Sequence, residues 1–231
     1  MSDLPEEFDC VVPDWEYVYS LSRSVSGDVR ASSFEPDAVV ALARGGWFAG
    51  RCLCDFLGLD DLLSLKMEHY VGTGQKTSEP QIRYPLAAGS LEDKDVLIVD
   101  DIADTGKSIE RAEAYVRKQD VGTVKTATLQ LLETSTTEPD FVGERLQEWV
   151  WVVYPWNFIE DMIDLLTGVM ESADANTFDT AELQRRLSER HGIGRIELEV
   201  AQPGRLGEVL EEMQRREIIE PVDGDRWTLS S

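Results

Sequence analysis

The sequence contains few cysteines, histidines and lysines, and these shortages exclude whole classes of structure. Three cysteines cannot all pair, none belongs to a Cys-x-x-Cys motif, and only two histidines accompany them. A disulfide framework and a His/Cys zinc site are therefore not indicated. We expect Cys10, Cys52 and Cys54 to be thiols in a reducing compartment.

Long apolar runs are also missing. No stretch reaches about eighteen apolar residues, the length that a transmembrane helix needs. The N-terminal residues MSDLPEEFDC are acidic, without the cationic region of a signal peptide or the arginines of a transit peptide. These absences predict a cytoplasmic protein that has no membrane partner.

Positive charge is scarce, because 22 Lys and Arg stand against 45 Asp and Glu, for a formal charge of -23. The acidic residues are spread along the chain, which indicates a solvated surface rather than a phosphate-binding tail. The pattern favours a halophilic protein, since a salt-rich cytoplasm would screen the self-repulsion. An acidic protein from an ordinary cytoplasm is the alternative. The 42% of apolar residues still supports a globular core.

Short apolar runs alternate with helix-length segments in the first two thirds of the chain. Strands are expected at residues 39–43, 62–67, 96–99, 124–132 and 149–153, after an N-terminal helix at 15–25. This alternation predicts an α/β fold with a mainly parallel five-stranded sheet flanked by helices.

A small polar stretch at residues 172–177 reads as a linker, so the chain is expected to divide into domains 1–171 and 178–231. In the second part we expect a helix at 179–191, a strand at 196–200, a helix at 206–218 and a hairpin around 223–225. This order is winged-helix-like. Because the helix at 206–218 carries four Glu and two Arg, DNA is an unfavoured partner. Packing against the same chain or a sister subunit is the alternative.

Residues 96–108, VLIVDDIADTGKS, carry the most chemistry. An apolar strand ends in two carboxylates, and a small-residue turn leads into a helix, the place where open α/β sheets bind ligands. The backbone N–H groups of residues 104–108, with the Thr105 and Ser108 hydroxyls, suit a phosphate, and Gly106 allows a close approach. Asp101 stands where a Walker A loop requires glycine.

This stretch resembles the signature of type I phosphoribosyltransferases, which bind phosphoribosyl pyrophosphate. Ala43-Arg44-Gly45-Gly46 is similar to the loop that holds pyrophosphate in that family, and the resemblance extends over roughly residues 8–170. The spacing Asp-Asp-x-x-Asp-Thr-Gly is similar to the 6-oxopurine branch, especially its short xanthine-guanine enzymes. The resemblance implies the type I phosphoribosyltransferase fold, Mg²⁺ as cofactor, and a homo-oligomer, either a dimer or a tetramer. It also implies purine salvage, with guanine, xanthine or hypoxanthine as the favoured base.

The resemblance assigns roles by position. It gives Asp100 and Asp101 to the ribose and its Mg²⁺, Ala103, Asp104, Thr105, Gly106, Lys107 and Ser108 to the 5′-phosphate, and Arg44, Gly45 and Lys66 to pyrophosphate. His69 and Tyr70 would begin a mobile polar loop at 71–80, although His69 as an ordinary exposed residue is an equal alternative. This loop would close over the substrate and exclude water.

Two more roles come with alternatives. Asp104 would be the general base or acid at purine N7, and it is also compatible with a helix N-cap. Trp151 would stack on the purine while the Val152 carbonyl reads the 2-position. Both tryptophans of the Trp151-Val152-Val153-Tyr154-Pro155-Trp156 stretch could instead fill the core.

The sequence departs from this branch at one base-contacting lysine, since the corresponding positions hold Leu132 and Glu133. We expect broader purine selectivity, with the donor to the 6-oxygen supplied by the backbone, by water, or by Lys125 or Thr134. On this reading, a lysine at position 132 would raise the use of 6-oxopurines. A regulator that senses phosphoribosyl pyrophosphate and binds DNA through its C-terminal domain is the rival function.

Overall fold

The computed structural model describes residues 7–72 and 75–230, and the side chains of residues 68–79 are outside the described part. The chain forms two compact units. We call Glu16–Trp149 the α/β unit, and Met1–Trp15 together with Val150–Ser231 the helical unit. Among the described residues, no helix combines the length and the apolar character that crossing a membrane requires.

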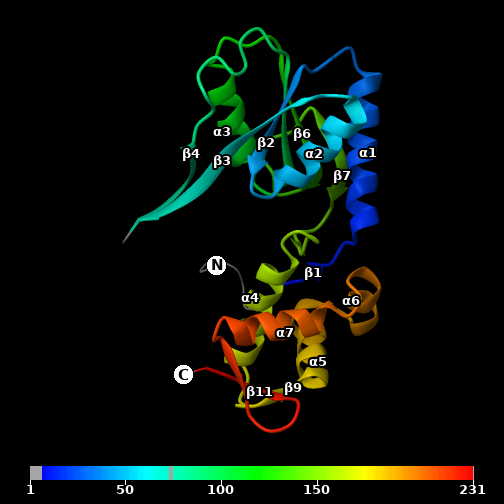
Figure 1. The fold of residues 1–231 in the computed structure, drawn as a ribbon, viewed down its shortest axis with the longest axis vertical. Helices are drawn as coiled ribbons and strands as arrows, with labels where there is room; N and C mark the ends of the chain where they lie inside the picture. The colour runs from blue at the N-terminus through cyan, green and yellow to red at the C-terminus, as the bar shows by residue number, and fades with distance from the viewer. Residues whose placement is uncertain (1–6, 73–74, 231) are drawn as a thin grey trace. The chain divides into compact units, whose positions relative to one another are not determined.

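The α/β unit contains a six-stranded sheet with the strand order β4-β3-β2-β5-β6-β7 (Figure 1). Its strands are β2 (Ala38–Ala43), β3 (Asp61–Gly72), β4 (Gln75–Tyr84), β5 (Val96–Ala103), β6 (Val124–Leu132) and β7 (Phe141–Leu146). All neighbours pair in parallel except β3 and β4, which form an antiparallel hairpin. The predicted α/β class and mainly parallel sheet are therefore confirmed.

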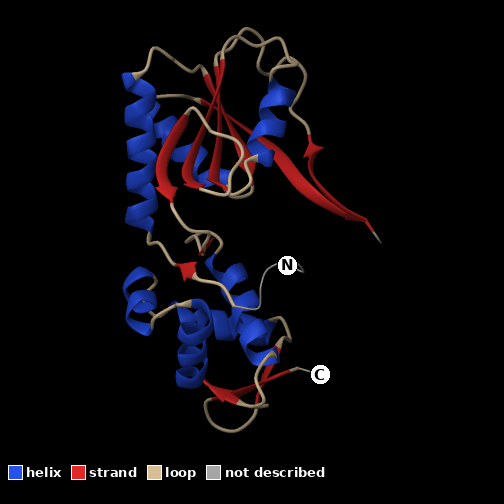
Figure 2. Ribbon diagram, turned by 180° about the vertical axis from the view of Figure 1, so that it is seen from behind, coloured by secondary structure: helices blue, strands red, loops and turns tan. Residues whose placement is uncertain are grey.

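Helices cover both faces of this sheet (Figure 2). Ile109 and Ala112 of α3 (Lys107–Val116) pack with Val40 and Ile98, on one face. Gly50 of α2 (Gly46–Leu57) faces Ala41 and Val39 on the other, where α1 (Trp15–Ala31) also lies. Because side chains alternate along a strand, the continuous apolar run of β2 is buried on both sides.

Two sequence predictions about the sheet are wrong in detail. Residues 149–153 do not join it; β7 pairs with β6 instead, and only Trp151–Val152 of the predicted strand is extended, as β8. The predicted loop at 71–80 belongs mostly to the β3–β4 hairpin, where backbone pairing needs no apolar side chains. The sheet therefore has six strands rather than five.

The helical unit brings together the two ends of the chain. β1 (Cys10–Val11) pairs in parallel with β8, and Phe158, Met162 and Leu166 of α4 (Phe158–Glu171) lie in its apolar core. Because α4 packs with the later helices, the chain divides at Val150 instead of the predicted stretch at 172–177.

The C-terminal part of this unit contains three helices and a three-stranded antiparallel sheet. Its elements are β9 (Phe178–Asp179), α5 (Thr180–His191), α6 (Arg195–Ala201), α7 (Arg205–Arg215), β10 (Ile219–Pro221) and β11 (Arg226–Leu229). The strand order is β10-β11-β9. The Asp179 carboxylate caps α5 by accepting from Glu182 N at 2.8 Å, and Gly192 ends it with φ 67°.

Residues 196–200 form helix α6 and not the predicted strand. The sequence IELEV alternates, but its pattern does not match the burial, because Leu198 is buried while Ile196 and Val200 are 79% and 72% exposed. At the start of the helix, Gly194 N donates to the Glu197 carboxylate at 3.3 Å. Local capping therefore overrides the strand-like alternation.

Asp161 of α4 is a buried carboxyl group in the helical unit, only 7% exposed. Asn157 donates to its Oδ1 at 3.4 Å, and Oδ2 has no hydrogen-bond partner among the described residues. Burial away from water is the largest influence, and it raises the pKa of Asp161 to about 7. The folded protein thus holds a proton that the unfolded chain releases near its ordinary pKa of 3.8.

The free energy of unfolding of wild type relative to Asp161→Asn should fall as the pH rises. A raised carboxyl pKa stabilises the fold fully below the unfolded pKa, and this contribution is lost as the pH rises through the folded pKa. Between pH 5 and 8 the difference should change by roughly 2–4 kcal/mol. Urea unfolding at both pH values measures it, with Asp174→Asn, an exposed carboxylate of the same unit, as control. Parallel pH profiles for wild type and Asp161→Asn would contradict the assignment.

Candidate active site

The candidate site lies at the carboxyl ends of β2 and β5, the two central strands. β2 continues along the chain to β3 on one side, whereas β5 leads to β6 on the other, so the strand order reverses between them. Ala41 pairs with Val99, which brings the segments after both strands to one edge. Such a reversal is where open α/β sheets bind ligands.

The glycines after β2 lie directly against the acidic pair. A Cβ on Gly46 would lie 2.6 Å from the Val99 carbonyl oxygen and 3.0 Å from Asp100 Cα. A Cβ on Gly45 would collide with the Asp101 carboxylate. A side chain at position 46 would meet backbone atoms that cannot move aside, and one at position 45 would displace the Asp101 carboxylate. The structure therefore brings together the two segments that the sequence singled out.

The two carboxylates are close, and that of Asp101 is nearly buried. Asp101 is 9% exposed, and its N–H donates to Asp100 Oδ1 at 3.1 Å, while Ile102 N donates to Asp101 Oδ1 at 2.9 Å. Burial is the largest influence that raises the pKa of Asp100 well above its ordinary value, and the Asp101 carboxylate adds to it. A bound cation would relieve this repulsion.

The donor set fits Mg²⁺ held jointly with a substrate. Within the described ranges, no group of three or more His, Cys, Asp or Glu side chains could hold a metal by itself. Mg²⁺ commonly keeps several waters and binds through one or two carboxylates together with substrate phosphates. Asp100 and Asp101 supply such a pair, with oxygens that already repel each other.

The loop after β5 leads into the N-terminus of α3. Ala103 ends the strand and is buried, Thr105 is exposed, and Lys107 and Ser108 begin the helix. Gly106, with φ 77°, is the N-cap residue of α3. The alternative that Asp104 is the N-cap is therefore wrong. The first N–H groups of α3 and its positive dipole end make this a suitable phosphate site.

Cationic side chains stand at the same edge of the sheet. Ala43 pairs with Lys66 on β3. Arg44, the next residue after β2, therefore lies at nearly the same level of the sheet as Lys66. The Lys66 ammonium lies 5.9 Å from the centroid of the Tyr84 ring. His69 and Tyr70 belong to β3, but their side chains are outside the described part of the structure.

Trp151 and Val152 belong to the helical unit. Val152 is 8% exposed, and the Trp151 ring is partly buried, with its centroid 6.4 Å from that of Phe8. Tyr154 and Trp156 stack at 4.6 Å with an interplanar angle of 9°. Trp151 therefore has a packing role within its own unit, as one of the two sequence interpretations held.

Leu132 cannot present a side chain to a ligand, because it is 2% exposed at the end of β6. Glu133 is exposed and borders a hollow of about 250 Å³ together with Ser135 and Arg145. Lys125 lies at the opposite end of β6 and donates to Asp140 at 2.6 Å. Of the side chains named for the missing lysine, only Thr134 contacts Asp104, with a donor–acceptor distance of 2.9 Å.

Sequence reasoning did not identify residues 135–137, which pack on the turn at residues 104–108. Ser135 and Thr137 crowd Gly106, and Thr136 N donates to the Thr105 carbonyl at 3.3 Å. The only sequence signal is a polar run between two strands, which is typical of any loop. Its position over Gly106 depends on the tertiary fold.

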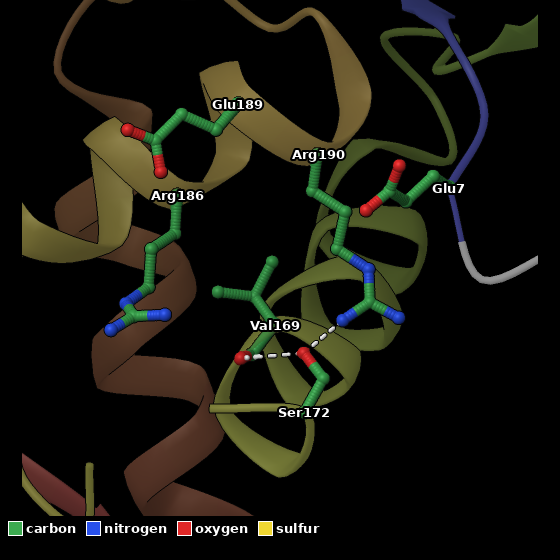
Figure 3. Close-up of a pocket in the computed structure, with 6 residues that line it drawn as sticks. All are labelled: Glu7, Val169, Ser172, Arg186, Glu189 and Arg190. Atoms are coloured by element: carbon green, nitrogen blue, oxygen red, sulfur yellow. Dashed lines mark hydrogen bonds between the residues drawn. The ribbon is translucent and has the colours of Figure 1, made fainter. Parts of the chain in front are cut away.

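A second hollow, of about 240 Å³, lies in the helical unit (Figure 3). Arg186, Arg190, Glu189 and Ser172 contribute to its lining. Arg190 donates to the Gly168 carbonyl at 2.9 Å and to Ser172 Oγ, so it caps the carboxyl end of α4. This hollow contains none of the residues that the motif analysis selected.

The Leu132→Lys variant should lose stability and not gain a base contact, contrary to the sequence expectation. Burying an ammonium group in place of a packed leucine should lower the free energy of unfolding by about 3–5 kcal/mol. Urea unfolding checks this, and Glu133→Lys, at the neighbouring exposed position, should change the free energy by less than about 0.5 kcal/mol. A Leu132→Lys protein as stable as wild type would contradict the burial of this site.

Comparisons with known proteins agree with this geometry. A family model described as the phosphoribosyl transferase domain matches residues 14–159. A xanthine-guanine phosphoribosyltransferase of Ruegeria sp. (strain TM1040) is 25% identical over 163 residues, which are 67% of this chain and 89% of that protein. A hypoxanthine-guanine phosphoribosyltransferase of Cricetulus griseus is 37% identical over 79 residues, 33% of this chain and 36% of that enzyme. The chain thus spans about a third of the length of that relative.

A solved structure shares the fold. The purine phosphoribosyltransferase from Pyrococcus horikoshii OT3 has a TM-score of 0.58 and 30% identity, and the match covers 64% of this chain and 94% of that one. The family model spans more than half of the chain and includes both glycine loops and the acidic pair. The chain therefore belongs to the phosphoribosyltransferase family and is a type I member related to the xanthine-guanine and purine enzymes.

Proposed function

We propose that the protein transfers the 5-phosphoribosyl group of phosphoribosyl pyrophosphate to a purine base, releasing pyrophosphate. The observation that carries the proposal is the contact between the glycines after β2 and the acidic pair near the carboxyl end of β5. It brings a phosphate loop, two carboxylates and Arg44 to one edge of the sheet. The names of the relatives support a purine acceptor, with guanine, xanthine or hypoxanthine favoured.

Each part of the donor substrate has a partner in this proposal. The N–H groups of residues 104–108 bind the 5′-phosphate at the start of α3, and Asp100 and Asp101 hold the ribose hydroxyls. Arg44, Gly45 and Lys66 bind the pyrophosphate. Mg²⁺, when bound near the acidic pair, neutralises charge on the pyrophosphate leaving group.

The acceptor side uses Asp104. Asp104 exchanges the proton of purine N7 as the glycosidic bond forms, which requires an exposed carboxylate, and Asp104 is exposed. His69 and Tyr70 on the β3–β4 hairpin help to exclude water from the reacting centre.

The C-terminal elements form a winged-helix-like module in this proposal, supported by the helices and by the sheet order β10-β11-β9. Arg215 and Arg216, at the end of α7, already have a partner, because Glu212 accepts from Arg215 at 2.5 Å and from Arg216 at 2.6 Å. We therefore favour a contact with another copy of the chain, in a homo-oligomer, over binding to DNA. The wide acidic surface supports operation in a salt-rich cytoplasm.

Nucleotide formation from phosphoribosyl pyrophosphate and radiolabelled purine bases, in molar salt with Mg²⁺, tests the proposed activity. Wild type should form nucleoside monophosphate, and Asp104→Asn should lower turnover about 10²–10⁴-fold, the range for one acid–base group. Glu110→Gln, on the exposed face of α3, should retain full turnover. A wild type that transfers to no purine would refute the proposal, and equal turnover by Asp104→Asn would remove the role of Asp104.

Affinity for phosphoribosyl pyrophosphate with Mg²⁺ tests the acidic pair separately. Asp100→Asn and Asp101→Asn should each weaken binding by about tenfold or more, because each removes a charged partner of the substrate and its cation. Titration calorimetry measures this loss. The exposed Glu92→Gln, ahead of β5 at the far end of that strand, serves as control. Unchanged affinity in both variants would show that the pair does not bind the substrate.

A further inference from the structure

Residues 134–137, which follow β6 and which we call the brace, pack against residues 104–108, the phosphate loop. Thr136 holds the Thr105 carbonyl twice, through its N–H at 3.3 Å and its hydroxyl at 3.2 Å. Ser135 Oγ donates to the Thr137 carbonyl at 2.8 Å, which fixes the turn of the brace. A Cβ on Gly106 would lie 2.5 Å from Thr137 Cβ, so loop and brace are in close contact.

One residue of this brace reaches the carboxylate of Asp104. Thr134 Oγ1 lies 2.9 Å from Asp104 Oδ1 and 3.2 Å from the Asp104 carbonyl oxygen. A hydroxyl has one hydrogen, and its bond to an ionised oxygen is the stronger choice. For Asp104 Oδ2, the described residues provide no hydrogen-bond donor.

We infer that Thr134 is a positioning residue for the proposed transfer reaction. Its hydroxyl holds Oδ1 and thereby fixes the rotamer of an exposed side chain, which leaves Oδ2 as the oxygen that meets the purine proton. An unrestrained exposed aspartate would sample several rotamers, and only a fraction of them would be productive. This inference rests on the proposed function and adds a residue that acts through Asp104.

Loss of the Thr134 hydroxyl should lower kcat without weakening the binding of phosphoribosyl pyrophosphate. Thr136, Ser135 and Thr137 hold the backbone of the phosphate loop without Thr134, so the 5′-phosphate site should survive its loss. The Thr134→Val variant keeps the shape of the side chain and removes the hydroxyl. We expect kcat to fall about 10- to 100-fold, the worth of one hydrogen bond to a charged group. The KM for phosphoribosyl pyrophosphate should stay within about threefold of wild type, since no donor contact changes.

A double-mutant cycle with Asp104→Asn, together with Thr134→Ser, tests the inference. Thr134→Ser retains the hydroxyl and should retain most of the kcat. In the Asp104→Asn background, Thr134→Val should cost less than about threefold, because the carboxylate that it positions is already gone. Purine phosphoribosyl transfer is measured for all four proteins of the cycle, and thermal unfolding confirms that each is folded.

The outcomes separate the inference from the function on which it rests. An active wild type with unchanged kcat in Thr134→Val would overturn the inference alone. So would equal losses with and without Asp104, or a Thr134→Ser protein as slow as Thr134→Val. A wild type that forms no nucleotide would overturn both the proposed function and the role of Thr134.

Discussion

The close approach between the segment after β2 and the end of β5 is the constraint on which the rest of the α/β unit depends. Gly46 lies under the Val99 carbonyl, where a side chain would push the strands apart, and Gly45 lies against the Asp101 carboxylate, which a side chain would displace. The parallel register of the two strands places these groups at one level. Burial and the neighbouring Asp101 carboxylate raise the pKa of Asp100 well above its ordinary value, and a cation bound at this edge would relieve the repulsion.

Much of the fold was predictable because its central elements have strong local patterns. The apolar runs of β2 and β5, and the helical period of α3 and α7, predict their own type without help from distant residues. The failures occur where the pattern is ambiguous. The sequence predicted a strand of the sheet at residues 149–153, but residues 141–146 pair with β6. Which segment pairs depends on how the chain returns after β6, and a local pattern does not show this.

The candidate site was predictable only where it is contiguous in sequence. Residues 100–108 form one strand, turn and helix, so their order along the chain is also their order in space. The contacts of Gly45 with Asp101 and of Thr134 with Asp104 join residues far apart in the chain, and their geometry follows from strand register. Leu132 shows the same limit. Spacing along the chain aligned it with a base-contacting position of the family, but the fold buries its side chain.

The acidic charge of the chain bears on both its folding and its proposed substrate binding. A chain of formal charge -23 would repel the proposed polyanionic substrate at long range, whereas the N-terminus of α3 and the cations at the same edge would attract it at short range. Salt screens beyond about 10 Å at 0.1 M and over still shorter distances at molar strength, so it removes the repulsion before it weakens the contacts. Elsewhere, as in Arg185 with Glu182 and Glu189, cations pair with carboxylates on the same helix. Under the proposed function, high salt would suit both the folding and the substrate binding of such a surface, which would link its composition to its chemistry.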